Sequence, residues 1–104
     1  MKNVLIATLA LVLAAPALAN QPVIVIQRGR MFHPDSITIQ PGQTVYFENK
    51  DEFLHQIYVY KGNIDYDSRE QPPGETLHIT FPRRGTYKIR CHIHPTMRLT
   101  VHVK

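Results

Sequence analysis

Short stretches in which hydrophobic and polar residues alternate constrain the fold of this chain more than any other feature. Residues 75–81 and 98–104 place every second side chain on a hydrophobic face, as a half-buried β-strand requires. Turn signals such as Pro41-Gly42 and Pro72-Pro73-Gly74 separate the stretches. No helical periodicity follows residue 20. The sequence therefore predicts an all-β domain of seven to eight strands, either a sandwich or a barrel.

The same pattern suggests that two distant parts of the chain meet. The expected strands lie at residues 23–28, 36–40, 43–49, 57–60, 75–81, 86–91 and 98–104. A short edge strand is also expected at residues 64–67. In a two-sheet fold the strands that contain Cys91 and Leu99 can be neighbours, so the loop between them lies at one end of the domain. His55 begins a strand and can lie at the same end.

The first 19 residues have the pattern of a secretory signal. Lys2 supplies the positive start, residues 4–15 form the apolar core, and Ala17-Leu18-Ala19 gives the small-x-small cleavage site. An uncleaved membrane anchor is the alternative, although the apolar run is short for a spanning helix. We therefore predict cleavage after Ala19, export to the periplasm, and one domain at residues 20–104 that does not insert into the membrane.

The lone cysteine needs an explanation, because oxidising compartments favour paired cysteines. Cys91 is the only cysteine in the chain, so it cannot form an internal disulfide. It could pair with another molecule, lie buried and inert, or bind a metal ion. A metal ion that links loops would also help so small a domain, whose hydrophobic core is modest.

The segment that begins at Cys91 favours a metal site. It places a thiolate, two imidazoles and a thioether close together, in the order Cys91-His92-Ile93-His94-Pro95-Thr96-Met97. Sulfur and imidazole are the donors that copper prefers. The spacing lets Cys91, His94 and Met97 reach one ion, and His55 is the candidate for a second imidazole. The sequence thus predicts one copper ion bound by His55, Cys91 and His94, with Met97 as a weak axial ligand.

Each of these residues has a simpler interpretation when it is taken alone. Cys91 could be a core thiol, His55 a surface residue at a strand end, and Met97 a packing residue. Zinc is the alternative metal, although structural zinc sites more often use paired Cys or His ligands without Met. His92 is the competing imidazole, but it follows Cys91 directly and should point the opposite way if the strand continues.

The other three histidines are expected at the surface. His78 and His102 fall on the polar side of their strands. His33 lies beside a thioether, that of Met31, and this pair could give a weak second metal contact.

A set of spaced positions extends over nearly all of residues 23–104. These positions are Phe32, Pro34, Ile37, Ile39, Gly42, Val45, Phe47, Asn49, Asp51, His55, Asp67, Ser68, Pro73, Gly74, Phe81, Gly85, Tyr87, Cys91, His94, Pro95, Met97 and Val101. With them the chain resembles the cupredoxins, the small blue-copper proteins, and most of all the plastocyanin, amicyanin and pseudoazurin group. The resemblance implies a Greek-key β-sandwich with one type 1 copper bound by His55, Cys91, His94 and Met97. It also implies one-electron transfer through the exposed edge of His94.

Some positions depart from that pattern. Gln56 follows the first ligand, where relatives often have an Asn that helps tie the two ligand loops together. Leu99 stands where relatives often have Gly, and His92 adds an imidazole beside the site. Small exported cupredoxins linked to copper tolerance also exist, and extra Met and His donors would suit that role.

Several functions follow from these patterns. The first is a periplasmic electron carrier between redox proteins, without enzyme activity. The second is a periplasmic copper-binding protein for copper tolerance or handling, in which Met31, His33 and His92 contribute. A copper enzyme would normally need a second copper centre or an open coordination position, and the sequence shows neither. A metal-free interaction module would leave the joint ligand pattern unexplained.

The charge of the chain bears on its partners. The formal net charge of +4 falls to +3 when Lys2 is removed, and most of the cations lie in the second half. They form either a merely solvated surface or a patch that steers an acidic redox partner. No basic run is longer than Arg83-Arg84, so nucleic-acid binding is not expected. We expect a monomer.

Overall fold

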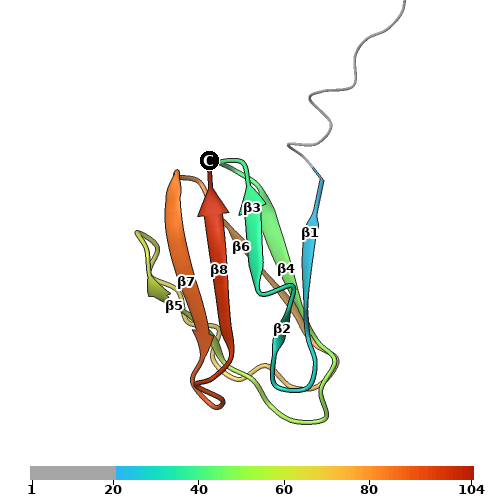
Figure 1. Cartoon of the computed structure of the whole chain (residues 1–104). Helices are drawn as coiled ribbons and strands as arrows, with labels where there is room; N and C mark the ends of the chain where they lie inside the picture. The colour runs from blue at the N-terminus through green and yellow to red at the C-terminus, as the bar shows by residue number, and fades with distance from the viewer. Residues whose placement is uncertain (1–20) are drawn as a thin grey trace, which may run out of the picture.

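The computed structural model describes residues 21–104, so the expected signal at residues 1–19 lies outside the described part of the chain. The described residues form eight strands in two four-stranded sheets that face each other (Figure 1). This part of the chain offers no helix of the length and apolarity needed to cross a membrane. The predicted fold class, an all-β Greek-key sandwich, is confirmed.

The strand order brings residues from distant parts of the sequence side by side. The bounds are β1 Val23–Gln27, β2 Phe32–His33, β3 Ser36–Ile39, β4 Thr44–Asn49, β5 Ile57–Lys61, β6 Thr76–Thr80, β7 Gly85–Cys91 and β8 Arg98–Val103. One sheet has the order β2-β1-β4-β6 and the other the order β3-β8-β7-β5. The pairs β1–β4 and β3–β8 are parallel, whereas the other neighbours are antiparallel.

The expected strands agree with the observed ones to within one residue at each end, with two exceptions. The short strand expected at residues 64–67 is wrong, because only a single bridge joins Tyr58 to Asp67 there. Strand β2 was not expected. Its two residues are too few for alternation to be visible, and it forms because His33 pairs with Ile26 of β1.

The hydrophobic core and the candidate ligands are continuous. Alternate residues of β7 point inward, so Tyr87, Ile89 and Cys91 are each 1% exposed or less. Met97 lies just before β8 and is also 1% exposed, within the same core cluster. Burial of one large apolar side chain stabilises a fold by roughly 1.5–3 kcal/mol. The loop from Cys91 to Met97 is therefore anchored at both ends in the hydrophobic core.

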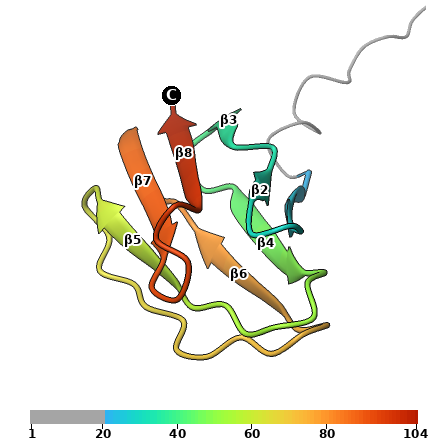
Figure 2. The same ribbon diagram turned by 60° about the horizontal axis from the view of Figure 1, so that its bottom comes forward.

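One end of the sandwich gathers the loops that matter for function. In Figure 2 this end is turned toward the viewer, and the segment after β7 lies beside the segments that follow β4 and β5. The turn between β1 and β2 reaches the same end in Figure 1. The expectation that His55 and the Cys91 loop share one end of the domain is therefore met.

Candidate metal centre

Three donor atoms from two loops converge at this end of the sandwich. His55 Nδ1 lies 3.6 Å from Cys91 Sγ and 3.3 Å from His94 Nδ1. All three donor atoms lie within 4.8 Å of one another. Within residues 21–104, this is the one group of three or more His, Cys, Asp or Glu side chains with metal-binding geometry.

Strand pairing fixes the backbone of Cys91, and a hydrogen bond fixes its sulfur atom. It is the last residue of β7 and pairs with Ile57 of β5 across the sheet. The Gln56 amide donates a hydrogen bond to Cys91 Sγ at 3.3 Å, and the His92 amide donates to the Gln56 carbonyl at 2.9 Å. The backbone of Gln56 thus ties the two candidate ligand loops together, while its side chain donates to Asp67 Oδ1 at 2.9 Å.

Met97 closes the loop that begins at Cys91. Its amide donates to the His94 carbonyl at 2.9 Å, which makes a tight turn through Pro95 and Thr96. The Met97 side chain packs in the core cluster that also contains Cys91. The Met97 thioether is therefore buried in the same core cluster as Cys91, at a position fixed by packing.

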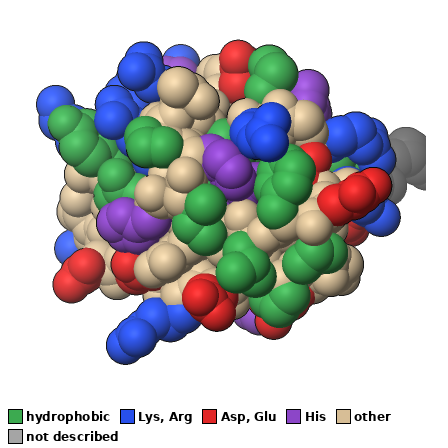
Figure 3. Space-filling model, turned by 90° about the horizontal axis from the view of Figure 1, so that it is seen from below, with side chains coloured by type: hydrophobic (Ala, Val, Ile, Leu, Met, Phe, Trp, Pro, Cys, Tyr) green, Lys and Arg blue, Asp and Glu red, His purple; other side chains and the backbone are tan. Residues whose placement is uncertain are grey.

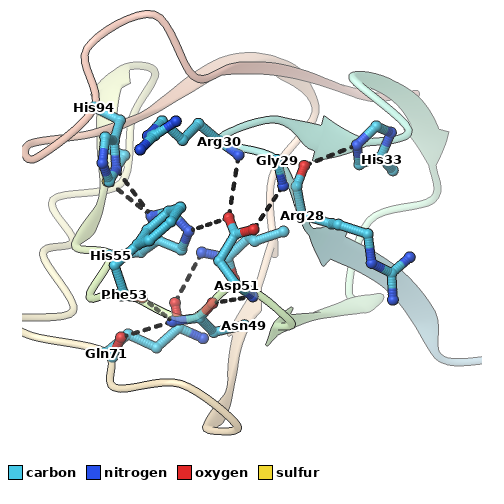
Figure 4. A network of polar contacts seen from close by, with 12 residues as sticks. Arg28, Gly29, Arg30, His33, Asn49, Asp51, Phe53, His55, Gln71 and His94 are labelled. Atoms are coloured by element: carbon cyan, nitrogen blue, oxygen red, sulfur yellow. Dashed lines mark hydrogen bonds and ion pairs between the residues drawn. The ribbon is translucent and has the colours of Figure 1, made fainter.

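A carboxylate orients the His55 ring, as Figure 4 shows. His55 Nε2 lies 2.8 Å from Asp51 Oδ2, and both side chains are buried, at 0% and 7% exposure. Because an ionised carboxylate can only accept, Nε2 carries the proton. Nδ1 then presents its lone pair to Cys91 and His94. Two imidazole nitrogens and a sulfur that converge on one point are a donor set that fits a soft metal ion.

Asp51 is itself fixed by the turn between β1 and β2. Its oxygens accept from the Gly29 amide at 2.6 Å and from the Arg30 amide at 3.1 Å. Both residues have positive φ, which turns their amides toward the carboxylate. Partial burial acts to raise the pKa of Asp51, but hydrogen bonds from His55, Gly29 and Arg30 outweigh it, so this pKa lies below its usual range.

The Asp51→Asn variant is expected to raise the reduction potential of the copper-loaded protein. The amide keeps the shape but loses the charge that favours Cu(II) over Cu(I). Loss of such an outer partner weakens metal binding about 10–100-fold. If only the affinity for Cu(II) falls, the reduction potential rises by about 60–120 mV, since a tenfold change in affinity corresponds to about 59 mV for one electron. Spectroelectrochemical titration measures the shift.

Asp67→Asn is the matched control for that variant. Asp67 also accepts from a histidine, because its Oδ2 lies 3.1 Å from His92 Nε2, but that pair is solvent-exposed. The pKa of Asp67 is lowered by the Arg69 amide first and by Gln56 second. A shift in Asp67→Asn as large as that in Asp51→Asn would contradict a specific role for the buried carboxylate.

His94 lies at the surface end of the donor cluster. It is half-buried, and its ring centroid lies 5.1 Å from that of His55 and 5.2 Å from that of Phe53. The Arg30 guanidinium covers the Phe53 ring at 4.6 Å. Partial burial, followed by the charges of His55 and Arg30, lowers the pKa of His94. The neutral imidazole that a metal needs is therefore the favoured form near neutral pH.

A buried amide network supports the backbone at His55. The Gln71 carbonyl accepts from the His55 amide at 3.1 Å, and the Gln71 amide donates to the His55 carbonyl at 2.7 Å. The Gln71 side chain donates to the carbonyls of Phe47 and Glu75, and it accepts from Gln27 Nε2 at 2.9 Å. Gln71 and Gln27 are both 0% exposed. The strand core therefore fixes the His55 loop through hydrogen bonds rather than through apolar packing alone.

Gln71→Ala is expected to destabilise the copper-free protein by about 2–4 kcal/mol, because buried partners lose their hydrogen bonds and a cavity forms. Urea unfolding measures this change. Gln40→Ala is the control, since Gln40 is exposed and such substitutions usually stay within about 0.5 kcal/mol. Equal stability of the two variants would show that the Gln71 side chain is dispensable.

The remaining histidines lie away from the donor cluster. His92 is exposed, stacks on Tyr58 with ring centroids 3.7 Å apart, and bonds to Asp67. His33 is exposed and its Nε2 lies 3.0 Å from the Arg28 carbonyl. His78 is exposed and His102 is half-buried. The structure thus separates the competing imidazole, His92, from the site, in line with the strand-phase argument.

Sequence reasoning did not find two of the residues that shape this site. Asp51 gave only a weak signal, namely a carboxylate four residues before His55 in a polar loop. Gln71 gave none, because a polar residue between Glu70 and Pro72 is typical of an exposed loop. Both act through contacts with segments that are distant in sequence.

Comparisons with known proteins agree with this geometry. A model of a family described as copper binding proteins, plastocyanin/azurin family, matches residues 22–104. Amicyanin from Paracoccus versutus is 31% identical over 90 residues, which cover 84% of this chain and 67% of that protein. The solved structure of Paracoccus versutus amicyanin has a TM-score of 0.71 and 28% identity, and the match covers 80% of this chain and 81% of that one.

Two further matches are parts of longer proteins. Methylamine utilization protein MauL from Methylophilus methylotrophus is 34% identical over 70 residues, which cover 64% of this chain and 40% of that protein. A copper-containing nitrite reductase from Thermus scotoductus SA-01 has a TM-score of 0.74 and 30% identity over 95% of this chain. This chain spans 25% of that reductase chain.

Proposed function

This chain belongs to the plastocyanin/azurin family of copper-binding proteins, and from that premise we propose that it is a periplasmic carrier of single electrons. Copper is the cofactor of this family, and we propose His55, Cys91, His94 and Met97 as the residues that hold it. The observation that carries the proposal is the convergence of His55, Cys91 and His94 within 4.8 Å.

The enclosure of the donors supports electron transfer rather than substrate chemistry. When bound, copper supplies a one-electron couple. His55 and Cys91 are at most 1% exposed, and the hydrogen bonds of Asp51 and Gln56 hold their donor atoms in place. Ligands that cannot move keep similar positions in both oxidation states, which lowers the cost of reorganisation on electron transfer. This chain's residues thus orient the donors and exclude water.

The surface around His94 suits brief contact with another protein. Figure 3 views this end of the sandwich and shows histidine side chains with hydrophobic ones around them. The loops at this end carry three exposed apolar side chains, which are Met31 at 54%, Leu54 at 37% and Ile93 at 43% exposure. Small contact areas are typical of transient electron-transfer encounters. We therefore assign the edge of His94 as the electron port.

The direct test is voltammetry of the copper-loaded protein with metal analysis after each cycle. We expect one copper per chain, a reversible one-electron wave, and full retention of copper in both oxidation states. A chelator specific for Cu(I), added after reduction, should remove the metal slowly compared with electron exchange. Rapid loss of copper on reduction would contradict a carrier role.

A role in copper handling is the second candidate, and one observation favours it. The exposed Met31 and the buried Met97 line the same hollow, of about 200 Å³, at the end of the sandwich that holds the donors. Thioethers bind Cu(I), so Met31 could receive the ion from the site. Under this alternative, Met31→Leu would slow copper transfer to the chelator. If the protein is an electron carrier, Met31→Leu and the unaltered protein should transfer copper to the chelator at the same rate.

We propose that this chain is not an enzyme, and that it acts as a monomer. The nitrite reductase match extends over only a quarter of the reductase chain. A copper enzyme would need an open coordination position or a second centre, and residues 21–104 present one donor cluster. The reduced protein is therefore expected to transfer no electrons to nitrite.

We also propose removal of residues 1–19, which N-terminal sequencing of the exported protein would test.

A further inference from the structure

The outer face of the β5-β7-β8 sheet carries a groove that is lined by four cations. These are Lys61 of β5, Lys88 and Arg90 of β7, and Arg98 of β8. We call this surface the basic groove. It has a volume of about 270 Å³, and no acidic side chain lines it. In Figure 3, Lys and Arg side chains gather at the upper left margin, the side on which β5 and β7 lie in Figure 1.

The cations of the basic groove face one another across the sheet. Arg90 is paired with Arg98, and Lys61 with Lys88. Like charges at directly opposite positions destabilise a sheet. None of the ion pairs found within residues 21–104 involves these four side chains. The fold therefore holds these four positive charges close together without an acidic side chain to neutralise them. An anionic partner would supply the missing negative charge.

Two of these cations are already held in position. The Arg90 guanidinium lies over the Tyr60 ring, 4.4 Å from its centroid, and Lys88 Nζ donates to Thr100 Oγ1 at 3.4 Å. A β-bulge between Val59 and Lys61 interrupts the register of β5 with β7. Such a bulge re-aims side chains, and here Tyr60 and Lys61 both line the groove. Pre-positioned charges bind a partner at a lower cost in side-chain entropy.

The basic groove adjoins the donor cluster at two points of the chain. Arg90 directly precedes Cys91, and Arg98 directly follows Met97. Arg98 also lines the hollow that Met31 and Met97 share. A molecule bound in the groove would therefore lie beside the loop that carries His94.

We propose that the basic groove docks a carboxylate-rich face of the redox partner protein, an inference that rests on the proposed electron-carrier function. Cations on this sheet repeat at about 5 Å across strands and about 7 Å along them. Acidic side chains three or four residues apart on a helix are spaced by about 5–6 Å, which matches this lattice. The groove is recessed, so a flat membrane surface fits it poorly. An aromatic rim at Tyr60 adds apolar contact that a protein surface can use.

The test uses the copper-loaded protein and a short fluorescent polyglutamate peptide as the probe. The groove variant is Lys61→Gln/Lys88→Gln, which leaves the neighbours of Cys91 and Met97 unchanged. The control is Arg83→Gln/Arg84→Gln, which removes the same charge from the turn between β6 and β7. We expect the peptide Kd to rise about tenfold in the groove variant at low salt and by less than twofold in the control, since each exposed ion pair contributes modestly.

Two further measurements decide between explanations. Amide shifts in the Cu(I) protein, titrated with the peptide, should map to β5, β7 and β8. Equal weakening in both variants, or shifts centred elsewhere, would overturn the inference, as would groove-dependent binding of phosphatidylglycerol vesicles without groove-dependent peptide binding. Both variants should keep the visible copper band and the potential of the unaltered protein. Absence of that band in the unaltered protein would count against the proposed function while leaving the peptide result independent.

Discussion

Cys91→Ser is expected to abolish the intense visible absorption that Cu(II) gives with the unaltered protein. That band arises from charge transfer between a thiolate and copper, and Cys91 is the only thiol in the chain. A serine hydroxyl is not deprotonated at neutral pH and is a poor ligand for copper. Because the thiolate is the strongest donor in the proposed set, we also expect copper affinity to fall by several orders of magnitude. Absorption spectra recorded during titration with one equivalent of Cu(II) measure both effects.

The fold must be checked in the same variant, since Cys91 is also a core residue. Its side chain is 1% exposed, and a buried hydroxyl costs about 1–3 kcal/mol unless it is hydrogen-bonded. The Gln56 amide, which donates to Cys91 Sγ, can donate to the serine oxygen and limit this cost. Circular dichroism of the copper-free variant should therefore show an intact sandwich. If the unaltered protein folds and gives no such band, Cys91 does not bind copper in this geometry.

The sequence was sufficient to predict most strands because alternation records which face of a strand is buried. In β8 the residues Leu99, Val101 and Val103 alternate with polar ones, and all three are at most 2% exposed. Alternation gives no signal where strand pairing, rather than burial, makes the element. Strand β2 has only two residues and depends on Ile26. Residues 64–67 alternate two hydrophobic side chains with two aspartates but form a single bridge to β5.

In the candidate site, too, some contacts could be predicted from the sequence and others could not. Cys91 and His94 could be predicted to meet because a short turn after a strand brings them together, whatever the rest of the chain does. The meeting with His55 needed the additional assumption of a two-sheet fold. The role of Asp51 could not be predicted, because it depends on the amides of Gly29 and Arg30 in the turn between β1 and β2. Local sequence patterns do not reveal contacts between segments that are distant in the chain.

Gln56 illustrates the limit of comparing residue types. Its side chain differs from the Asn that often helps tie the two ligand loops together in relatives. In the structure the link uses backbone atoms, since the Gln56 amide and carbonyl contact Cys91 Sγ and the His92 amide. Any residue other than proline can make these bonds. The tie between the loops therefore does not depend on the Gln56 side chain, which donates to Asp67 instead.

The second large effect is expected for His94→Gly, in which the half-buried imidazole at the surface end of the cluster is removed. The buried donors of His55 and Cys91 stay in place, so the variant should still bind copper but with an open position toward solvent. We expect electron exchange with a small redox complex to fall by at least about 100-fold, because the electron port is lost and water enters the site. Added imidazole should occupy the opening and restore the visible spectrum, which stopped-flow and absorption measurements would follow.

His92→Gly provides the matched control, because His92 is the neighbouring imidazole in the same loop. It stacks on Tyr58 and bonds to Asp67 outside the donor cluster, so its removal leaves the three donor atoms unchanged. The visible spectrum should be retained, the rate should change by no more than a few-fold, and imidazole should have no effect. If His92→Gly lost the spectrum and recovered it with imidazole while His94→Gly did not, the two histidines would have to exchange roles. Such a result would mean that the loop rearranges when copper binds, since only a reversed turn after Cys91 could bring His92 to the metal.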